Sequence, residues 1–263
     1  LHTGVTFHSE RVAAGDRVHL VPANHTIHNC HFFAISRTGQ TYQGAIGVAY
    51  GGVMGLRITR NLIHDLNHTA IFFFGNEIVM EGNEIYNCVL QGDDAGAVYT
   101  GRDWTFQGNV FRHNYLHHNG SSGRHPVYGS MGIYHDDAAG GTLVEGNIFE
   151  YVSKAVFAGG GINTRVENNI FVHCTPAYWI DERGLSWDGG GFMRERFEAV
   201  KADAPQWAAR YPNFNLVVDA YRKKAGVPPV GNSFIRNIVV DSPRKWMISP
   251  WATIPAHLPF RQN

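Results

Sequence analysis

Acidic residues are concentrated in three short segments of the 263-residue chain. The segments are GDDAGAVYTGRDW (92–104), GIYHDD (132–137) and WIDERG (179–184), and together they hold seven of the 22 Asp and Glu residues. Like charges that lie close together raise one another's pKa, so such a cluster is costly unless a reaction or a cation uses it. Arg102 and Arg183 are the nearby counter-charges, and structural salt bridges to them are the alternative explanation.

Asp136 and Asp181 take the same position in two similar β-prone runs, and Gly159 takes it in the run between them. If the runs are stacked strands, two strand spacings separate the two aspartate backbones by about 9.6 Å. The glycine between them leaves room for a ring. Two carboxyl groups in this range suit glycoside hydrolysis, with one as general acid and the other as base or nucleophile. Asp137 is an alternative first carboxylate, because a strand that ends at Asp136 need not keep its alternation.

Flat and polar side chains of the same segments are expected to bind a sugar. Tyr99, Tyr134 and Trp179 offer faces on which sugar rings rest, although an aromatic ladder is more often core packing. His68 precedes another such run, and His135 adjoins the first aspartate. The predicted substrate-binding residues are His68, Asp94, Tyr99, Arg102, Asp103, Tyr134, His135, Trp179, Glu182 and Arg183.

A repeated unit positions these segments. Each unit has a short β-prone run, an Asn and an aliphatic or aromatic pair, and the Asn recurs as Asn61, Asn83, Asn114, Asn147 and Asn169. Steps of 22 to 33 residues, with a period of two inside each unit, are typical of a β-solenoid with inserted loops. Because a second apolar strand type follows each unit, the pattern predicts an all-β parallel β-helix. We expect the Asn side chains to hydrogen-bond along the axis while their own backbone adopts the left-handed conformation.

Alternation decides which side chains face the solvent. Along the second strand type, aliphatic residues occupy one face while aromatic and acidic residues share the other. Burying unpaired aspartates in the core would cost several kcal/mol per charge, so we assign the aliphatic residues to the interior. The acidic groove is therefore expected on the outer surface.

The repeat stops after Gly184 and returns at Asn237. Between them, Pro205 suits an early helix position and Gly226 suits a C-terminal cap. We therefore expect one parallel β-helix domain over residues 1–263. It would carry a helical and loop insertion at 186–230, with the helices near residues 190–226.

Composition excludes some partners. The formal net charge is zero, so no basic field is available to attract nucleic acid. No apolar run approaches the length of a membrane helix, which argues against a membrane partner. We expect a secreted or periplasmic protein, although no signal peptide is visible in the chain. The oligomeric state is left open.

Fifteen histidines invite a metal interpretation, but the motifs do not support one. No HxxxH motif lies on an expected helix, and no Cys/His pair occurs at zinc-finger spacing. Six of the fifteen lie near a corner Asn, where we expect the ring to cover a turn, namely His28, His64, His113, His117, His118 and His173. We therefore predict neither a metal site nor a cofactor.

Several segments together resemble a known group of proteins. They are AIFFFGNE, DDAGAVYTGRDW, GIYHDD, AGGGINTRVENNIFVHC, WIDERG, Trp207-x-x-Arg210-Tyr211-Pro212 and GNSFIRNIVV. Over most of its length the chain resembles bacterial right-handed parallel β-helix repeat proteins that include or border glycoside hydrolase family 141. The resemblance implies a right-handed coil, a sugar-active groove on the aspartate-bearing strands, and fucosidase or xylanase action on plant cell-wall polysaccharides.

The leading hypothesis is a glycoside hydrolase that acts on a plant or algal polysaccharide. The second is a polysaccharide lyase, in which a cation such as Ca²⁺, bound by Asp93, Asp94, Asp136 or Asp137, neutralises a uronate before a base removes a proton. The third is a carbohydrate-binding solenoid without catalysis. The residues alone do not decide between retention and inversion, or between internal and terminal cleavage.

Overall fold

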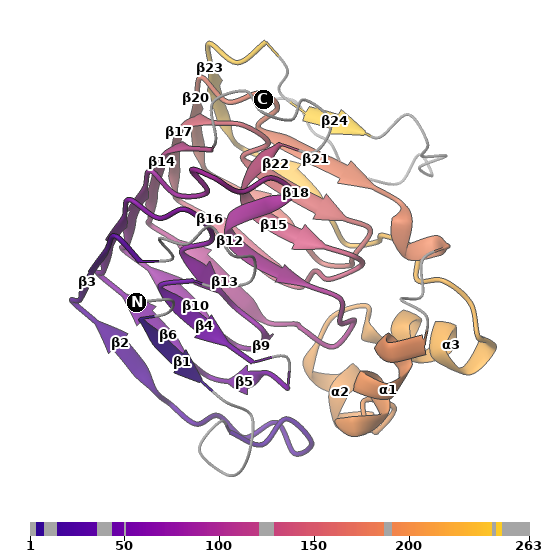
Figure 1. The fold of residues 1–263 in the computed structure, drawn as a ribbon. Coiled ribbons are helices and arrows are strands. Elements are labelled where there is room, and N and C mark those ends of the chain that lie inside the picture. Colours follow the sequence, from indigo (N-terminus) through magenta and orange to yellow (C-terminus); the bar gives the residue numbers. More distant parts are fainter. Residues whose placement is uncertain are drawn as a thin grey trace.

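The chain winds into a solenoid of parallel strands (Figure 1). The computed structural model describes residues 4–7, 15–35, 44–49, 51–120, 129–186, 191–243 and 246–248. The first sheet contains, in order, β1 (Val5–Phe7), β4 (Ile46–Val48), β8 (Ile71–Phe72), β12 (Ala95–Gly101), β15 (Ser130–Asp136), β18 (Val156–Gly159), β21 (Tyr178–Asp181) and β24 (Trp246–Ile248). The second contains β2 (Thr26–His28), β6 (Arg57–Thr59), β10 (Val79–Glu81), β13 (Asn109–Arg112), β16 (Thr142–Glu145), β19 (Arg165–Glu167) and β22 (Ser233–Ile235).

The third sheet completes each coil. It contains β3 (His31–Phe33), β7 (Leu62–His64), β11 (Glu84–Tyr86), β14 (Tyr115–Asn119), β17 (Ile148–Val152), β20 (Ile170–Val172) and β23 (Ile238–Val240). A small pair, β5 (Val53–Met54) and β9 (Gly75–Asn76), lies between the first and second sheets along the chain. In each sheet, strands from successive coils pair side by side and in parallel. The predicted parallel β-helix is therefore confirmed.

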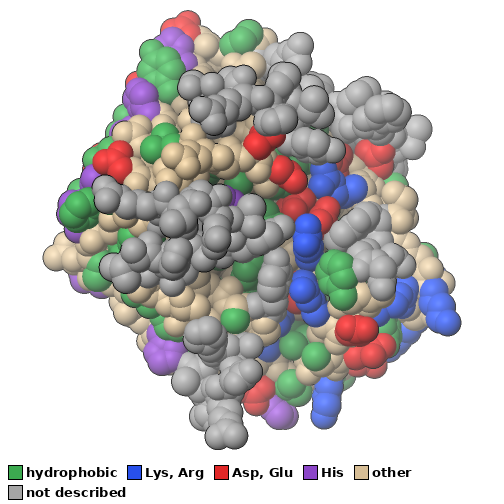
Figure 2. Space-filling model, viewed as in Figure 1, with side chains coloured by type: hydrophobic (Ala, Val, Ile, Leu, Met, Phe, Trp, Pro, Cys, Tyr) green, Lys and Arg blue, Asp and Glu red, His purple; other side chains and the backbone are tan. Residues whose placement is uncertain are grey.

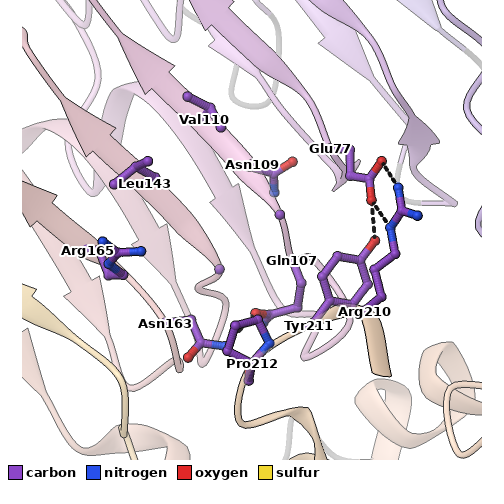
Figure 3. A pocket seen from close by; sticks show the side chains of 12 residues that line it. Glu77, Gln107, Asn109, Val110, Leu143, Asn163, Arg165, Arg210, Tyr211 and Pro212 are labelled. Carbon is purple, nitrogen blue, oxygen red and sulfur yellow. Dashed lines mark hydrogen bonds and ion pairs between the residues drawn. The ribbon is translucent and has the colours of Figure 1, made fainter. Parts of the chain in front are cut away.

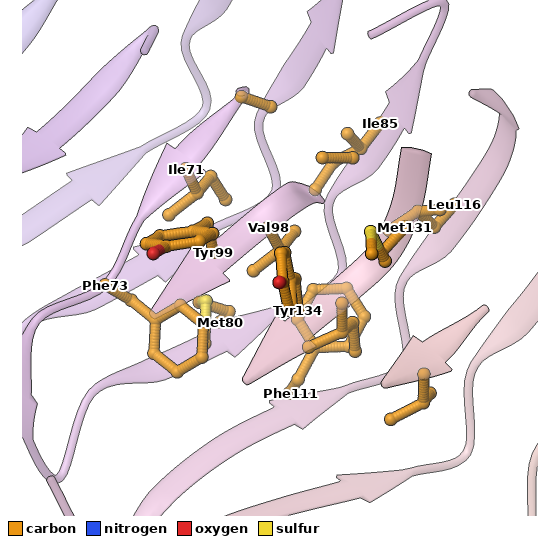
Figure 4. Packing of buried hydrophobic residues seen from close by; sticks show 14 of the residues in the cluster. Ile71, Phe73, Met80, Ile85, Val98, Tyr99, Phe111, Leu116, Met131 and Tyr134 are labelled. Carbon is orange, nitrogen blue, oxygen red and sulfur yellow. The ribbon is translucent and has the colours of Figure 1, made fainter. Parts of the chain in front are cut away.

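Stacked apolar side chains fill the interior of the coil (Figure 4). In the first sheet Ile71 is in register with Val98, and Val98 with Ile133. In the second sheet Met80 is in register with Phe111. All five side chains are fully buried, and each removes apolar surface from water at about 25 cal/mol per Å². The predicted inward column is confirmed, so the residues that alternate with it in the first sheet face outward.

A column of asparagines joins the coils at the corner between the second and third sheets. The backbone N–H and the Nδ2 of Asn83 donate to Oδ1 of Asn114 at 2.8 and 2.9 Å. Nδ2 of Asn114 also donates to the carbonyl of Met80 in the preceding coil at 3.0 Å. The same ladder runs through Asn61, Asn83, Asn114, Asn147, Asn169 and Asn237. Hydrogen bonding along the axis is therefore confirmed.

The left-handed backbone lies one residue earlier than predicted. Positive φ angles occur at the residue before each ladder Asn, namely Arg60, Gly82, His113, Gly146, Asn168 and Arg236, with values from 54° to 66°. The ladder asparagines themselves are not among the residues with positive φ. The chain turns first, and the Asn that follows can then direct its amide along the axis.

Three short helices interrupt the solenoid between β21 and β22. They are α1 (Phe192–Ala199), α2 (Pro205–Arg210) and α3 (Phe214–Lys223), and a 3-10 turn, η2 (Arg183–Leu185), precedes them. Their buried side chains form a separate apolar cluster in which the rings of Trp207 and Phe214 lie 5.3 Å apart. The predicted helical insertion is confirmed, and Pro205 begins α2 as expected.

The predicted cap of the last helix is wrong. The left-handed cap of α3 is Lys224, two residues before Gly226. None of the helices in the described part of the chain has the length and apolar character to cross a bilayer.

We predict that Asn114→Ala lowers the free energy of unfolding by about 3 kcal/mol. The substitution leaves two buried donors of Asn83 without their acceptor, and each unsatisfied donor costs about 1–3 kcal/mol. Urea denaturation measures the effect. Asn215→Ala, at an exposed position of α3, is the control and is expected to leave the midpoint almost unchanged. Equal midpoints for the two variants would show that the ladder does not hold the coils together.

Candidate functional site

Acidic and basic side chains gather on the outer side of the first sheet, near the helical insertion (Figure 2). A cavity of about 170 Å³ opens there beside β8 and β12. It is lined by His68, Phe72, Asp93, Asp94, Ala95, Tyr99, Arg102 and Asp136. Five of the predicted site residues therefore lie around one space, namely His68, Asp94, Tyr99, Arg102 and Asp136.

Asp136 is the carboxyl group that the protein environment perturbs most clearly in this cavity. It ends β15, and only 6% of its surface is exposed. Burial raises its pKa, and so does the neighbouring charge of Asp137. Hydrogen bonds from Tyr134 and Tyr99, and the charge of Arg183, act in the opposite direction without cancelling the rise. A carboxyl group of this kind retains a proton to higher pH than an exposed one, as a general acid requires.

Tyr134 contacts a second carboxyl group of the cavity. Its hydroxyl donates to Oδ1 of Asp94 at 3.0 Å. Asp94 and Asp136 line the same space. Asp94 lies just before β12, on backbone with a φ of 51°. Asp93 also lines the cavity, whereas the sequence pattern names it only as a cation ligand of the lyase alternative; its adjacency to Asp94 is the signal for a place among the substrate contacts.

His68 supplies a neutral ring. It is 6% exposed, and its ring lies 6.1 Å from that of Phe72. Burial lowers the pKa of His68, so the imidazole is uncharged near neutral pH. Its Nδ1 is buried and has no hydrogen-bond partner in the described part of the chain. The ring can therefore offer a hydrogen bond to a ligand in the cavity.

Arg183 fills the space that was expected to lie open between Asp136 and Asp181. Its guanidinium donates to Asp136 at 3.0 Å and to Asp137 at 3.2 Å, and it pairs with Asp181 at 2.8 Å. Burial opposes the charge of Arg183, but the ion pairs outweigh burial and raise its pKa. A Cβ added at Gly159 would lie 3.4 Å from Nε of this arginine. The expectation of a ring-sized gap opposite Gly159 is therefore wrong.

Arg102 and Arg183 also form ion pairs with aspartates that lie outside the cavity. Nε of Arg102 donates to Oδ2 of Asp137 at 3.0 Å. Neither Asp137 nor Asp181 lines the cavity. Structural salt bridging, the alternative explanation of the acidic segments, thus accounts for these two aspartates.

Trp179 and Glu182 also lie outside the cavity lining. The ammonium of Lys154 sits over the Trp179 ring, 4.6 Å from its centre. Glu182 is half-buried at the start of η2. The structure therefore does not bring these two side chains to the space that holds Asp136.

His135 and Asp103 face away from the cavity, contrary to prediction. His135 is fully buried inside the coil, with its ring edge-on to Phe73 at 5.9 Å, because alternation along β15 turns it inward. Asp103 is also fully buried; it accepts hydrogen bonds from Thr105 and lies 3.9 Å from Arg17. Neither side chain can contact a ligand on the outer face.

A second hollow of about 330 Å³ lies between the second sheet and the helical insertion (Figure 3). Arg210 donates to both carboxylate oxygens of Glu77 there, at 2.5 and 2.7 Å, and the Tyr211 hydroxyl donates to the same group. Asn163 donates to Gln107 at 3.0 Å. These polar groups satisfy one another and hold the insertion against the solenoid, so they offer no acid–base pair.

The described ranges contain no group of three or more His, Cys, Asp or Glu side chains arranged to hold a metal ion. The aspartates named for the lyase reaction therefore form no cation site of that size among these residues. Asp137 pairs with two arginines instead.

Comparison with known families agrees with the architecture. Residues 12–193 match the family model described as the right-handed β-helix region. The chain belongs to this right-handed β-helix family. No curated protein and no solved structure matched the chain. A right-handed β-helix is compatible with a carbohydrate-active solenoid, and family membership by itself assigns no reaction to this member.

We predict that Arg183→Met destabilises the protein by about 3 kcal/mol near neutral pH, because it leaves three carboxylates without their shared cation. The loss should be smaller at about pH 5 than at about pH 8. The pKa of Asp136 is already raised in the folded protein and rises further without Arg183. The folded state then binds protons that the unfolded state has released, so stability falls as pH increases.

Thermal or urea unfolding at several pH values measures this dependence. Arg222→Met, at an exposed position of α3, is the control. A destabilisation of Arg183→Met that does not change with pH would contradict the electrostatic explanation.

Proposed function

We propose that this protein is a glycoside hydrolase that cleaves a polysaccharide at the cavity on the first sheet. One observation carries the proposal: Asp136, a buried carboxyl group with a raised pKa, faces the same small space as Asp93 and Asp94. Glycoside hydrolysis needs one carboxyl group that holds a proton and a second that is ionised. The family is compatible with this activity.

Asp136 acts as the general acid that protonates the leaving oxygen. Asp94, or its neighbour Asp93, acts as the second carboxyl group in place of Asp181, because among the described residues these two acids line the cavity with Asp136. The Tyr134 hydroxyl orients Asp94 by donating to its Oδ1 at 3.0 Å.

The remaining lining residues bind the sugar. Phe72 and Tyr99 contribute apolar surface, and their rings meet edge to face at 5.5 Å. His68 offers a neutral hydrogen-bonding group beside them. The resemblance to glycoside hydrolase family 141 directs the substrate screen to plant cell-wall polysaccharides and their algal counterparts.

We predict that Asp136→Asn lowers the release of reducing sugar at least about 100-fold, the usual contribution of a general acid. Asn is nearly isosteric and can still accept the hydrogen bond from Tyr99, so the urea midpoint should change little. The screen uses plant and algal polysaccharides with product sizing. Asp219→Asn, exposed on α3, is the matched control and should retain activity. Undiminished turnover by Asp136→Asn would exclude this role.

The same screen separates hydrolysis from elimination. An unsaturated product that absorbs in the near ultraviolet, and that is lost when a chelator is added, would support the lyase instead.

A further inference from the structure

A ladder of aromatic and imidazole rings covers part of the outer face of the third sheet, along the left edge in Figure 2. The rings of His64 and Tyr86 stack at 4.6 Å with an angle of 5° between their planes. Tyr86 and His117 stack at 4.7 Å and 13°. Because these rings stack face to face along the axis, they direct edges and not faces toward solvent. The surface thus offers ring nitrogens and no platform for sugars.

Two histidines approach each other at one end of this ladder. Nε2 of His31, on β3, lies 2.7 Å from Nε2 of His64, on β7. Their ring centres are 4.9 Å apart. The two residues are 33 positions apart in sequence. They meet because His31 is in register with Leu62 and His64 lies two residues farther along the same face.

A carboxylate fixes the orientation of His64. Nδ1 of His64 lies 2.9 Å from Oδ2 of Asp65, and Nδ2 of Asn87 donates to the other oxygen of Asp65 at 3.1 Å. A carboxylate only accepts, so Nδ1 of His64 carries the hydrogen. The lone pair of its Nε2 then points at His31. Metal-binding histidines are typically held in this way, by a carboxylate on the nitrogen that does not bind the metal.

We propose that His31 and His64 bind a divalent transition-metal ion with an affinity for imidazole, such as Zn²⁺. Ligand bonds of about 2.0–2.1 Å in a tetrahedral site separate two nitrogens by about 3.3 Å. The two rings therefore need to part by only about 0.6 Å. In the metal-bound form His31 carries its hydrogen on Nδ1, so both Nε2 lone pairs reach the ion and no net proton is released.

The site would be partly hydrated and of moderate affinity. Within the described residues no third His, Cys, Asp or Glu completes a metal-binding group, so water occupies the other positions. Four protein ligands make a structural zinc site much tighter. The ion would join β3 to β7, which belong to successive coils, and would resist their separation. This binding site is independent of the sugar cavity on the first sheet.

Zinc titration of the purified full chain tests the proposal. We expect one Zn²⁺ per chain by isothermal titration calorimetry at neutral pH, and an increase in Tm with added ZnCl₂. His31→Phe and His64→Phe retain an aromatic ring for stacking but lose the ligand nitrogen, so each should weaken this binding at least about tenfold and abolish the increase in Tm. Asp65→Asn should weaken binding about tenfold by removing the carboxylate charge behind His64.

His113→Asn is the matched control. His113 has an exposed ring and a positive φ that Asn tolerates. This variant should bind zinc as the wild type does. Equal zinc affinity in His31→Phe, His64→Phe and the wild type would overturn the proposal, and so would a wild type without a zinc-dependent change in heat or Tm. Because the readouts are metal binding and stability, the result does not depend on glycoside hydrolysis.

Discussion

The asparagine ladder is the constraint on which the rest of the fold depends. A parallel solenoid can slip by one residue, and a slip would exchange its inner and outer faces. The side-chain amide prevents this, because Oδ1 of each Asn accepts from both the backbone and the side chain of its neighbour. With the register held at one corner, Ile133 faces the core and Asp136 faces outward. The candidate site thus depends on a corner that takes no part in it.

Charge at the site is controlled by burial and by one arginine. Asp136 is buried, which disfavours its ionised form, and the charge of Arg183 partly offsets that effect. The same guanidinium pairs with Asp137 and Asp181. These ion pairs explain why the three segments contain more acidic residues than a single reaction needs.

Local periodicity predicted the fold well, since alternation and Asn spacing are properties of adjacent residues. The position of Arg183 could not be found in this way, because its partners come from two strands of different coils. His135 adjoins Asp136 in sequence but not on the groove, because alternation along β15 places its side chain inside the coil with that of Ile133. The buried position of Asp103 depends on its contact with Arg17, which is distant in sequence. A local sequence pattern does not contain such a contact.

The ladder accepts coils of very different length. Its steps span 22, 31, 33, 22 and 68 residues, yet every step closes with the same amide hydrogen bonds. Additional residues therefore leave the coil as loops or helices without altering the stacking geometry. The Asp93–Asp94 segment lies in one of these longer steps, and the helical insertion lies in the longest. Evolution can consequently lengthen, shorten or exchange the segments beside the cavity while the scaffold beneath it stays the same.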